Sequence, residues 1–217
     1  MSLTEKIKIV LADDHQLLRT GLKNIIEQKS NLAVIGEASN GREAIKVCGK
    51  LLPDVVIIDV SMPDLNGIEA AKQISKIHPN IKIIALSMHS SKQFIQGMFN
   101  AGAYAYLLKD GDSEDLVTAI NTVTRNMKYL AKELDQEILT SLKKGDSIEN
   151  AALSTREKEV LQLIAEGNSS KDIGEVLFLS SKTVDVHRNN IMKKLDLFSI
   201  SELTKYAIRK GLTSLDT

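Results

Sequence analysis

The stretch that decides the fold is VVIIDVSMPDLNG, residues 55–67. Its first four residues are β-branched, and such a run favours a strand that is buried on both faces. The run ends on Asp59, a carboxylate that needs water, a charged partner or a metal ion. The stretch therefore predicts a buried strand whose end meets solvent at a polar site.

Similar apolar runs recur on both sides of this strand and alternate with amphipathic segments. Strands are predicted at residues 6–12, 32–37, 54–59, 81–87 and 104–108, with helices at 15–28, 40–51, 67–77, 91–101 and 112–127. Regular alternation of strand and helix favours a parallel sheet with helices on both faces. Residues 5–125 are therefore predicted to form an α/β domain with a doubly wound, five-stranded parallel sheet.

The pattern changes after residue 125. A helix is predicted at 130–142 and a polar linker, KKGDSIEN, at 143–150, so that residues 126–150 form a helix and linker. Residues 151–217 show only helical patterns, at 154–166, 170–177, 181–195 and 199–209. Four short helices with short turns suit a small all-α DNA-binding domain.

The composition excludes several classes of protein. The 217 residues include 28 basic and 28 acidic side chains, so any contact with nucleic acid must use a local basic patch. The single Cys48 excludes an internal disulfide framework and fits a reducing compartment. No apolar run has the length of a membrane span, and the N-terminus does not resemble a signal peptide. We expect a cytoplasmic protein without a membrane partner.

Charged and hydroxyl side chains follow the predicted strands. Asp13 and Asp14 follow the first strand, Asp59 closes the third, and Ser87 and Lys109 follow the fourth and fifth. A parallel sheet brings these positions to one edge. Three neighbouring carboxylates imply a bound cation, and oxygen ligands favour Mg²⁺. With Lys109 they predict a site for a phosphoryl group, where Asp59 is placed to attack phosphorus.

Two kinds of enzyme also use phosphate sites at a strand end. A dinucleotide-binding enzyme needs a glycine-rich turn after the first strand, whereas residues 12–15 read ADDH. A phosphatase of the haloacid dehalogenase type needs a second aspartate two residues after its nucleophile, and Ser61 occupies that position. Both enzyme classes are disfavoured, and we expect a protein that is not an enzyme.

Residues 5–125 resemble the response-regulator receiver domain, whose fold is flavodoxin-like. The motifs that carry the resemblance are Asp13-Asp14, Asp59 with Met62-Pro63 and Gly67, Ser87 and Lys109. The resemblance implies that a sensor histidine kinase transfers a phosphoryl group to Asp59.

The same resemblance assigns further roles. It implies that Mg²⁺ is held by Asp13, Asp14, Asp59 and the backbone carbonyl of Ser61. Ser87 and Lys109 would contact the phosphoryl group, and Tyr106 matches an aromatic switch position. His15 and His89 are interpreted as residues at the rim of the site.

Residues 152–212 resemble the LuxR-type helix-turn-helix domain. The matching segments are LSTRE at 153–157, EVL at 159–161, AEG at 165–167, KDI at 171–173, LS at 179–180 and KTV at 182–184. The two domains together resemble the NarL/FixJ type of two-component response regulator. The resemblance implies double-stranded promoter DNA as a partner and a homodimer when the protein is active or on DNA.

Residues 181–195 are the predicted recognition helix. Helical periodicity places Val184, Ile191 and Leu195 on one apolar face. The side chains predicted to contact DNA are Lys182, Thr183, Asp185, Val186, Arg188, Asn189, Asn190, Lys193 and Lys194. Asparagine can read adenine, and lysine can meet guanine or phosphate. An ordinary amphipathic helix with a solvated polar face has the same periodicity.

Four features of the helical domain depart from the expected pattern or add to it. Asp185 stands where relatives often carry lysine, so it is predicted to weaken attraction to phosphate. Gly174 is predicted to cost about 1 kcal/mol against alanine if exposed. Asp196 stands where glycine usually ends such a helix. Leu203 and Ala207 are predicted to be exposed and to supply a dimer interface.

The sequence thus predicts a DNA-binding transcriptional regulator that phosphorylation of Asp59 controls. The alternative is a DNA-binding regulator of the same architecture whose control does not depend on phosphorylation.

Overall fold

The computed structural model describes residues 6–132, 134 and 153–213. The chain forms two compact units, which consist mainly of the residues before and the residues after 135–152 in the sequence, and each is described by itself. Within the described ranges, no helix is long and apolar enough to cross a membrane.

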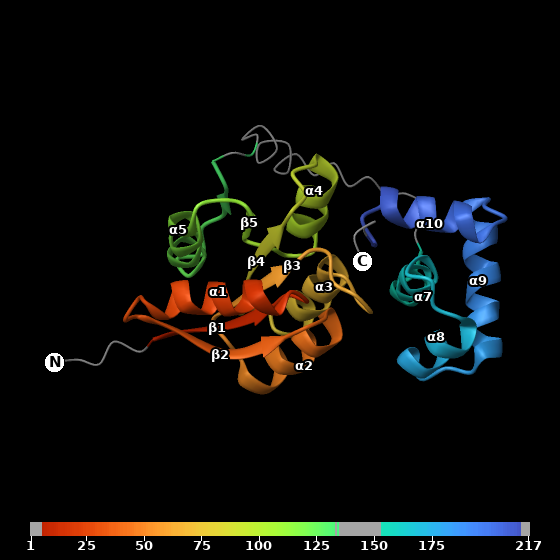
Figure 1. Ribbon diagram of the computed structural model, residues 1–217, viewed down its shortest axis with the longest axis horizontal. Coiled ribbons are helices and arrows are strands. Elements are labelled where there is room, and N and C mark those ends of the chain that lie inside the picture. Colours follow the sequence, from red (N-terminus) through yellow and green to blue (C-terminus); the bar gives the residue numbers. More distant parts are fainter. Residues whose placement is uncertain (1–5, 133, 135–152, 214–217) are drawn as a thin grey trace. The chain divides into compact units, whose positions relative to one another are not determined.

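The first unit is built on a single parallel sheet (Figure 1). Its strands are β1 Ile7–Ala12, β2 Leu32–Ala38, β3 Val55–Asp59, β4 Lys82–Ser87, β5 Ala105–Leu108 and β6 Tyr129–Leu130. They lie in the order β2-β1-β3-β4-β5-β6, so β3 lies near the middle of the sheet. All five residues of β3 are buried, which explains its unbroken apolar run.

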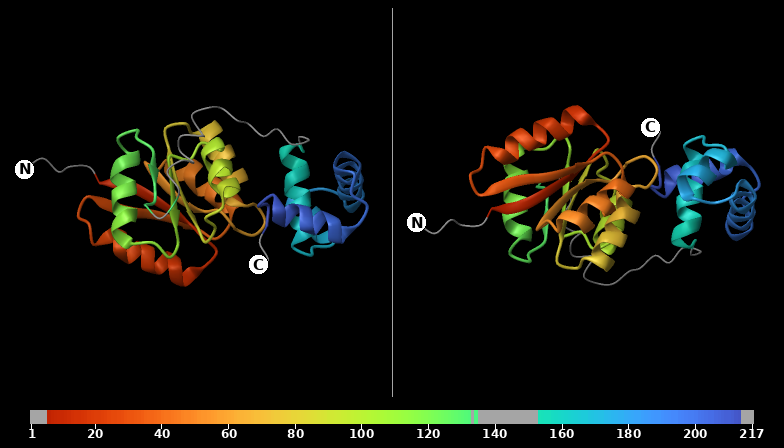
Figure 2. Two further views of the ribbon diagram at one scale, coloured as in Figure 1. Left: turned by 90° about the horizontal axis from the view of Figure 1, so that it is seen from above. Right: turned by 90° about the horizontal axis from the view of Figure 1, so that it is seen from below.

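Five helices cover the two faces of this sheet. They are α1 Gln16–Glu27, α2 Gly41–Leu51, α3 Gly67–Ile77, α4 Lys92–Asn100 and α5 Ser113–Val123. Helices α1 and α5 lie on one face and α2, α3 and α4 on the other (Figure 2). The five predicted α/β units are therefore confirmed, with ends that differ from the predicted ones by a few residues.

Gly67 shows why the opening stretch ends on a glycine. It begins α3, where Asn66 caps the helix by accepting a hydrogen bond from the Glu69 amide. A Cβ atom at Gly67 would lie 2.0 Å from the backbone oxygen of Asp59. Only glycine lets α3 begin this close to the end of β3.

The sheet has a sixth strand, which the predicted five-stranded sheet lacked. Helix α5 ends at Val123, and the chain turns through Asn126 at a φ of 61° before it pairs with β5. Tyr129 lies opposite Ala105, and Leu130 opposite Tyr106. Leu130 was predicted to begin a helix. That prediction was wrong at this residue, because a two-residue strand is too short to show a periodic pattern. Most of the predicted helix 130–142, and all of the linker 143–150, lie outside the described residues.

The second unit consists of four described helices. They are α7 Thr155–Ala165, α8 Ser170–Leu177, α9 Ser181–Leu195 and α10 Ile200–Arg209. A serine precedes each helix and accepts a hydrogen bond from a backbone amide of the first turn, as N-cap residues do. The capping serines are Ser154, Ser169, Ser180 and Ser199. Local sequence thus sets where each helix begins.

The core of the second unit corrects one prediction. Leu203 and Ala207 are fully buried, in a cluster that includes Val160 of α7 and Ile191 of α9. They were predicted to be exposed. Periodicity identifies an apolar stripe on α10, but it does not reveal that the stripe packs within the domain.

Two departures from the expected pattern have structural explanations. Gly174 is buried, and a Cβ atom there would lie 2.7 Å from the backbone oxygen of Leu179. Its role is therefore close approach between α8 and the following turn. Asp196 adopts the left-handed conformation (φ 54°, ψ 45°) that usually favours glycine at the end of a helix.

Candidate functional site: a carboxylate pocket and an exposed helix

The charged pocket forms where β1, β3 and β5 end. The Nζ atom of Lys109 lies 2.8 Å from Oδ2 of Asp13 and 2.8 Å from Oδ2 of Asp59. All three side chains are almost completely buried. The topology of the sheet thus brings together residues that are far apart in the sequence.

Burial and charge set the protonation of this pocket. Burial raises the pKa of Asp59 to about 6, although the Lys109 ammonium opposes the rise. Burial alone would lower the pKa of Lys109, but its contacts with Asp59 and Asp13 outweigh this and raise that pKa. At neutral pH Asp59 is therefore mainly ionised and Lys109 is charged.

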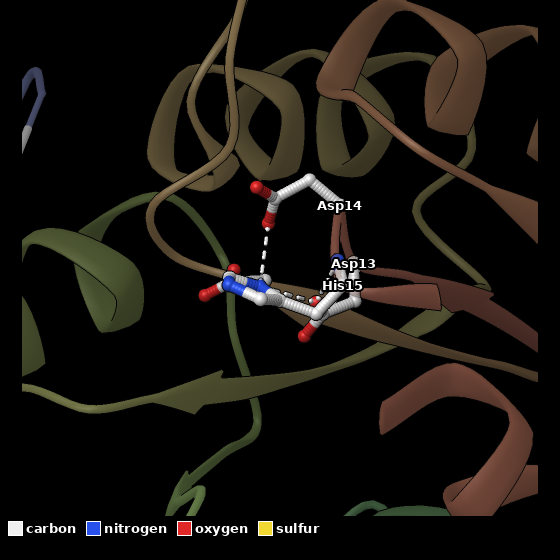
Figure 3. Close-up of side chains that lie close together, drawn as sticks. Asp13, Asp14 and His15 are labelled. Atoms are coloured by element: carbon white, nitrogen blue, oxygen red, sulfur yellow. Dashed lines mark hydrogen bonds and ion pairs between the residues drawn. The ribbon is translucent and has the colours of Figure 1, made fainter. Parts of the chain in front are cut away.

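Asp14 and His15 lie beside Asp13 (Figure 3), and ligand atoms of all three lie close to Asp59. The Nδ1 atom of His15 is 3.0 Å from Oδ1 of Asp14 and 3.2 Å from Oδ1 of Asp13. The backbone amide of His15 also donates to Asp13 at 2.8 Å. Interpreting His15 as a residue at the rim missed these contacts, which depend on side-chain conformation.

The positions of the ligand atoms in the pocket suit a bound cation. One ligand atom each from Asp13, Asp14, His15 and Asp59 can lie within 4.8 Å of all the others. Oδ1 of Asp14 is buried and accepts no hydrogen bond in the described structure, although Nδ1 of His15 lies close to it. A buried anionic oxygen in that condition is costly unless a cation accompanies it. The residues therefore fit the predicted Mg²⁺.

Ser61 takes part in the pocket through its backbone. Its amide donates to Oδ1 of Asp59 at 3.1 Å, which helps to orient the carboxylate. The predicted role of its carbonyl as a metal ligand remains a prediction.

Ser87 and Tyr106 both contact the backbone of His89. The Ser87 hydroxyl accepts from the His89 amide at 3.0 Å, and the Tyr106 hydroxyl donates to the His89 carbonyl at 2.7 Å. Both side chains are fully buried. Burial raises the pKa of Tyr106, so its hydroxyl is protonated and can donate. The segment after β4 is thereby held by a residue on β4 and a residue on β5.

Helix α9 presents most of the predicted DNA contacts to solvent. Lys182, Val186, Asn189, Asn190 and Lys193 are exposed, whereas Val184 and Ile191 are buried in the domain core. Three further residues, Thr183, Asp185 and Arg188, are partly buried. The two-sided character of the helix is therefore confirmed.

Several of the predicted contacts are engaged within the domain. Oδ1 of Asp185 accepts from the Ser170 hydroxyl at 2.8 Å and pairs with Arg188 at 3.1 Å. Asp185 therefore joins α8 to α9, a role that was not apparent from the sequence. The Nζ atom of Lys194 lies 2.8 Å from a carboxylate oxygen of Glu157, which ties the end of α9 to α7.

Two family models match the chain. "Response regulator receiver domain" matches residues 9–121, and "Bacterial regulatory proteins, luxR family" matches residues 151–207. The chain is 36% identical over 213 residues to the response regulator UvrY of Escherichia coli, covering 97% of this chain and 98% of that protein. It is 38% identical over 214 residues to the oxygen regulatory protein NreC of Staphylococcus haemolyticus, covering 95% and 99%.

A solved structure agrees with these matches. RcsB of Salmonella enterica serovar Typhimurium, bound to a promoter in the presence of the phosphomimetic BeF3⁻, has a TM-score of 0.60 and 28% identity. The match covers 96% of this chain and 100% of that one. The chain belongs to the two-component response regulators that join a receiver domain to a LuxR-type DNA-binding domain, a family of transcription regulators and not of enzymes.

Proposed function

We propose that Asp59 accepts a phosphoryl group from a sensor histidine kinase and that this transfer controls promoter binding by α9. The observation that carries the proposal is the pair of 2.8 Å contacts from Lys109 to Asp59 and Asp13. An ionised Asp59 can attack phosphorus, and the Lys109 ammonium can neutralise charge on the transferred group.

Mg²⁺ would be held by Asp13, Asp14, Asp59 and the backbone carbonyl of Ser61. When bound, it would neutralise the charge that develops on the phosphoryl oxygens. The protein contributes the orientation of the nucleophile. The Ser61 amide and the Lys109 ammonium each hold one oxygen of the Asp59 carboxylate.

Ser87 and Tyr106 would report phosphorylation to the rest of the receiver. A new phosphoryl oxygen would attract the Ser87 hydroxyl, because a charged acceptor forms a stronger hydrogen bond than a neutral one. Ser87 would then release the His89 amide, and Tyr106 would follow the His89 carbonyl. The segment between β4 and α4 would change conformation as a result.

On DNA, α9 would lie in the major groove. Asn189, Asn190 and Lys193 would make polar contacts with bases, Lys182 would contact phosphate, and Val186 can meet a thymine methyl group. Thr183 and Arg188, which are partly buried, would contact the DNA backbone beside this surface. Asp185 and Lys194 would act mainly by holding α9 in the domain, through Ser170 and Glu157.

The protein would bind paired half-sites as a homodimer in the cytoplasm. One solved relative is described as two RcsB dimers bound to two parallel DNAs, which supports a dimer in this proposal. The cytoplasmic location follows from the proposed partners, because the protein must meet promoter DNA as well as the histidine kinase that supplies the phosphoryl group. Leu203 and Ala207 cannot form the dimer interface in the folded domain, because both are fully buried.

The test is selection of bound DNA sequences by the full chain, with and without acetyl phosphate and Mg²⁺. We expect the phosphodonor to increase recovery of one sequence class at least tenfold, and Asp59→Asn to abolish both phosphate uptake and the increase. Phosphate uptake by Asp59→Asn would contradict the assignment of the acceptor. An equal and strong selection by both proteins in either condition would favour control that does not depend on phosphorylation.

A further inference from the structure

His15 is the one nitrogen donor in the group of candidate metal ligands that the described residues form. Its Nδ1 atom faces Oδ1 of Asp14 at 3.0 Å and Oδ1 of Asp13 at 3.2 Å (Figure 3). The backbone of His15 is held locally, because its amide donates to the same oxygen of Asp13. The imidazole is thus directed between two carboxylates that the metal site needs.

A single hydrogen on Nδ1 of His15 cannot bond to the carboxylates of both Asp13 and Asp14. A neutral imidazole either donates from Nδ1 or offers a lone pair there. The geometry is that of a hydrogen bond to Asp13, while Oδ1 of Asp14 is left buried and without a hydrogen bond. A cation between the three atoms would be attracted by both oxygens and by the Nδ1 lone pair. The arrangement therefore suits a metal with affinity for nitrogen as well as oxygen.

We propose that His15 ligates the metal through Nδ1 and gives this pocket a preference for Mn²⁺ or Co²⁺ over Mg²⁺. Mg²⁺ prefers oxygen ligands and retains several water molecules, so the imidazole adds little to its binding. Affinity for sites with nitrogen ligands rises from Mn²⁺ to Co²⁺ along the first transition series, and imidazole suits these ions better than it suits Mg²⁺. This inference rests on the metal-dependent phosphorylation proposed above and specifies the metal.

The rest of the pocket leaves room for this role. His15 is mostly exposed at its side chain, so the ring can adjust to a metal without disturbing the core. Asp59 and Asp13 are fixed by Lys109, whereas among the described residues the ion-pair partner of Asp14 is His15. Asp14 and His15 are therefore the two ligands free to close on a metal from the solvent side.

The first measurement is direct detection of the nitrogen ligand. The full-length protein is loaded with Mn²⁺, and electron spin-echo modulation is recorded for coupling to a directly bound ¹⁴N nucleus. We expect the coupling in the wild type and in His78→Ala, which removes a histidine at the far end of α3, and its loss in His15→Ala. Absence of the coupling in the Mn²⁺-loaded wild type overturns the proposal.

The second measurement compares affinities. Mn²⁺ binding is followed by the electron paramagnetic resonance signal of the free ion. Mg²⁺ binding is followed by its competition with Mn²⁺. His15→Ala should weaken Mn²⁺ binding at least about tenfold, since even outer partners of a metal ligand change affinity by that factor. Mg²⁺ binding should change by less than about threefold. Equal losses for the two ions would mean that His15 acts only through the carboxylates, and the proposal would be wrong.

Acetyl phosphate labelling separates this inference from the proposed function. If wild type and His15→Ala are both phosphorylated in Mg²⁺ but show no difference in metal preference, the proposed function stands and the role of His15 fails. If the wild type binds neither ion and is not phosphorylated with either, both fail together.

Discussion

The carboxylate pocket and the recognition helix place functional side chains in opposite ways. The pocket gathers residues from the ends of β1, β3 and β5 and buries almost all of Asp13, Asp59 and Lys109. Helix α9 presents a row of side chains from one continuous segment and leaves most of them in water. The pocket therefore depends on the whole sheet, and its burial raises the pKa of Asp59. The helix depends on the periodic pattern of one segment.

The largest expected effects come from substitutions that shorten a core side chain beneath each region. Ile58 in β3 and Ile191 in α9 are both fully buried. Substitution of a buried isoleucine by alanine removes packed methyl groups and typically costs about 2–5 kcal/mol. We expect Ile58→Ala to reduce phosphate uptake and Ile191→Ala to reduce DNA binding, each measured at rising temperature. If Ile191→Ala lowered phosphate uptake as strongly as Ile58→Ala, the two regions would not depend on separate cores.

The pH dependence of stability should distinguish the buried pocket from the exposed helix. The pKa of Asp59 is raised from its ordinary value of 3.8 to about 6 in the folded protein. Between these values the folded state keeps a proton that the unfolded state has released. This difference in protonation stabilises the folded state below pH 4, and the stabilisation is lost as pH rises through 6. For a pKa shift of this size the loss is on the order of 3 kcal/mol.

Urea unfolding in EDTA, from pH 4 to 8, measures this contribution as a difference between wild type and Asp59→Asn. The wild type should lose stability relative to the variant as pH rises. A difference that stays constant across this range would contradict the raised pKa. Asp185→Asn on α9 is the matched control, because it makes the same change at a carboxylate outside the pocket, one that pairs with Arg188.

Two glycines test how closely each region is packed. Gly174→Ala should destabilise the second unit by about 1–3 kcal/mol, the usual cost of overpacking, because the new methyl group meets the Leu179 carbonyl. Gly21 lies in α1, where an added Cβ would meet nothing within 4 Å. Gly21→Ala should therefore stabilise the receiver by about 0.5–1 kcal/mol. Thermal unfolding measures both, and a stabilising Gly174→Ala would disprove the close approach.

The smallest expected effects come from two exposed lysines of α9, one of which, Lys194, pairs with a carboxylate of the domain. Lys182→Ala should reduce the slope of log affinity against log salt by about 0.9, the value for one lost phosphate contact. Lys194 already pairs with Glu157, so Lys194→Ala should change the slope less. Titration of labelled promoter DNA from 50 to 300 mM salt measures both slopes. Equal changes would show that Lys194 leaves Glu157 to meet DNA.

Much of this architecture was predictable from local patterns. The apolar runs defined β1 to β5, and topology then placed Asp13, Asp59 and Lys109 together without any knowledge of side-chain contacts. The buried face of α9 followed from helical periodicity alone. These features depend on properties that repeat along the chain, and such properties are visible in one sequence.

The features that were not predicted from the sequence depend on contacts between segments that are distant in the chain or on side-chain conformations. Strand β6 is too short for a pattern, and the burial of Leu203 and Ala207 depends on contact within the helical domain. The contacts of His15 with Asp14, and of Asp185 with Ser170, depend on side-chain conformations. No spacing in the sequence distinguishes these arrangements from exposed alternatives.

Strand β6 also covers part of one edge of the sheet. The amides of Tyr129 and Ala131 donate to the carbonyls of Tyr104 and Tyr106, so β6 uses hydrogen-bonding groups that β5 would otherwise present at the margin of the sheet. An exposed, apolar edge strand can pair with a strand of another chain, and such pairing leads to aggregation. Two residues of strand therefore act as a built-in protection against intermolecular β-pairing, and this protection operates in every state of Asp59 that leaves β6 in place.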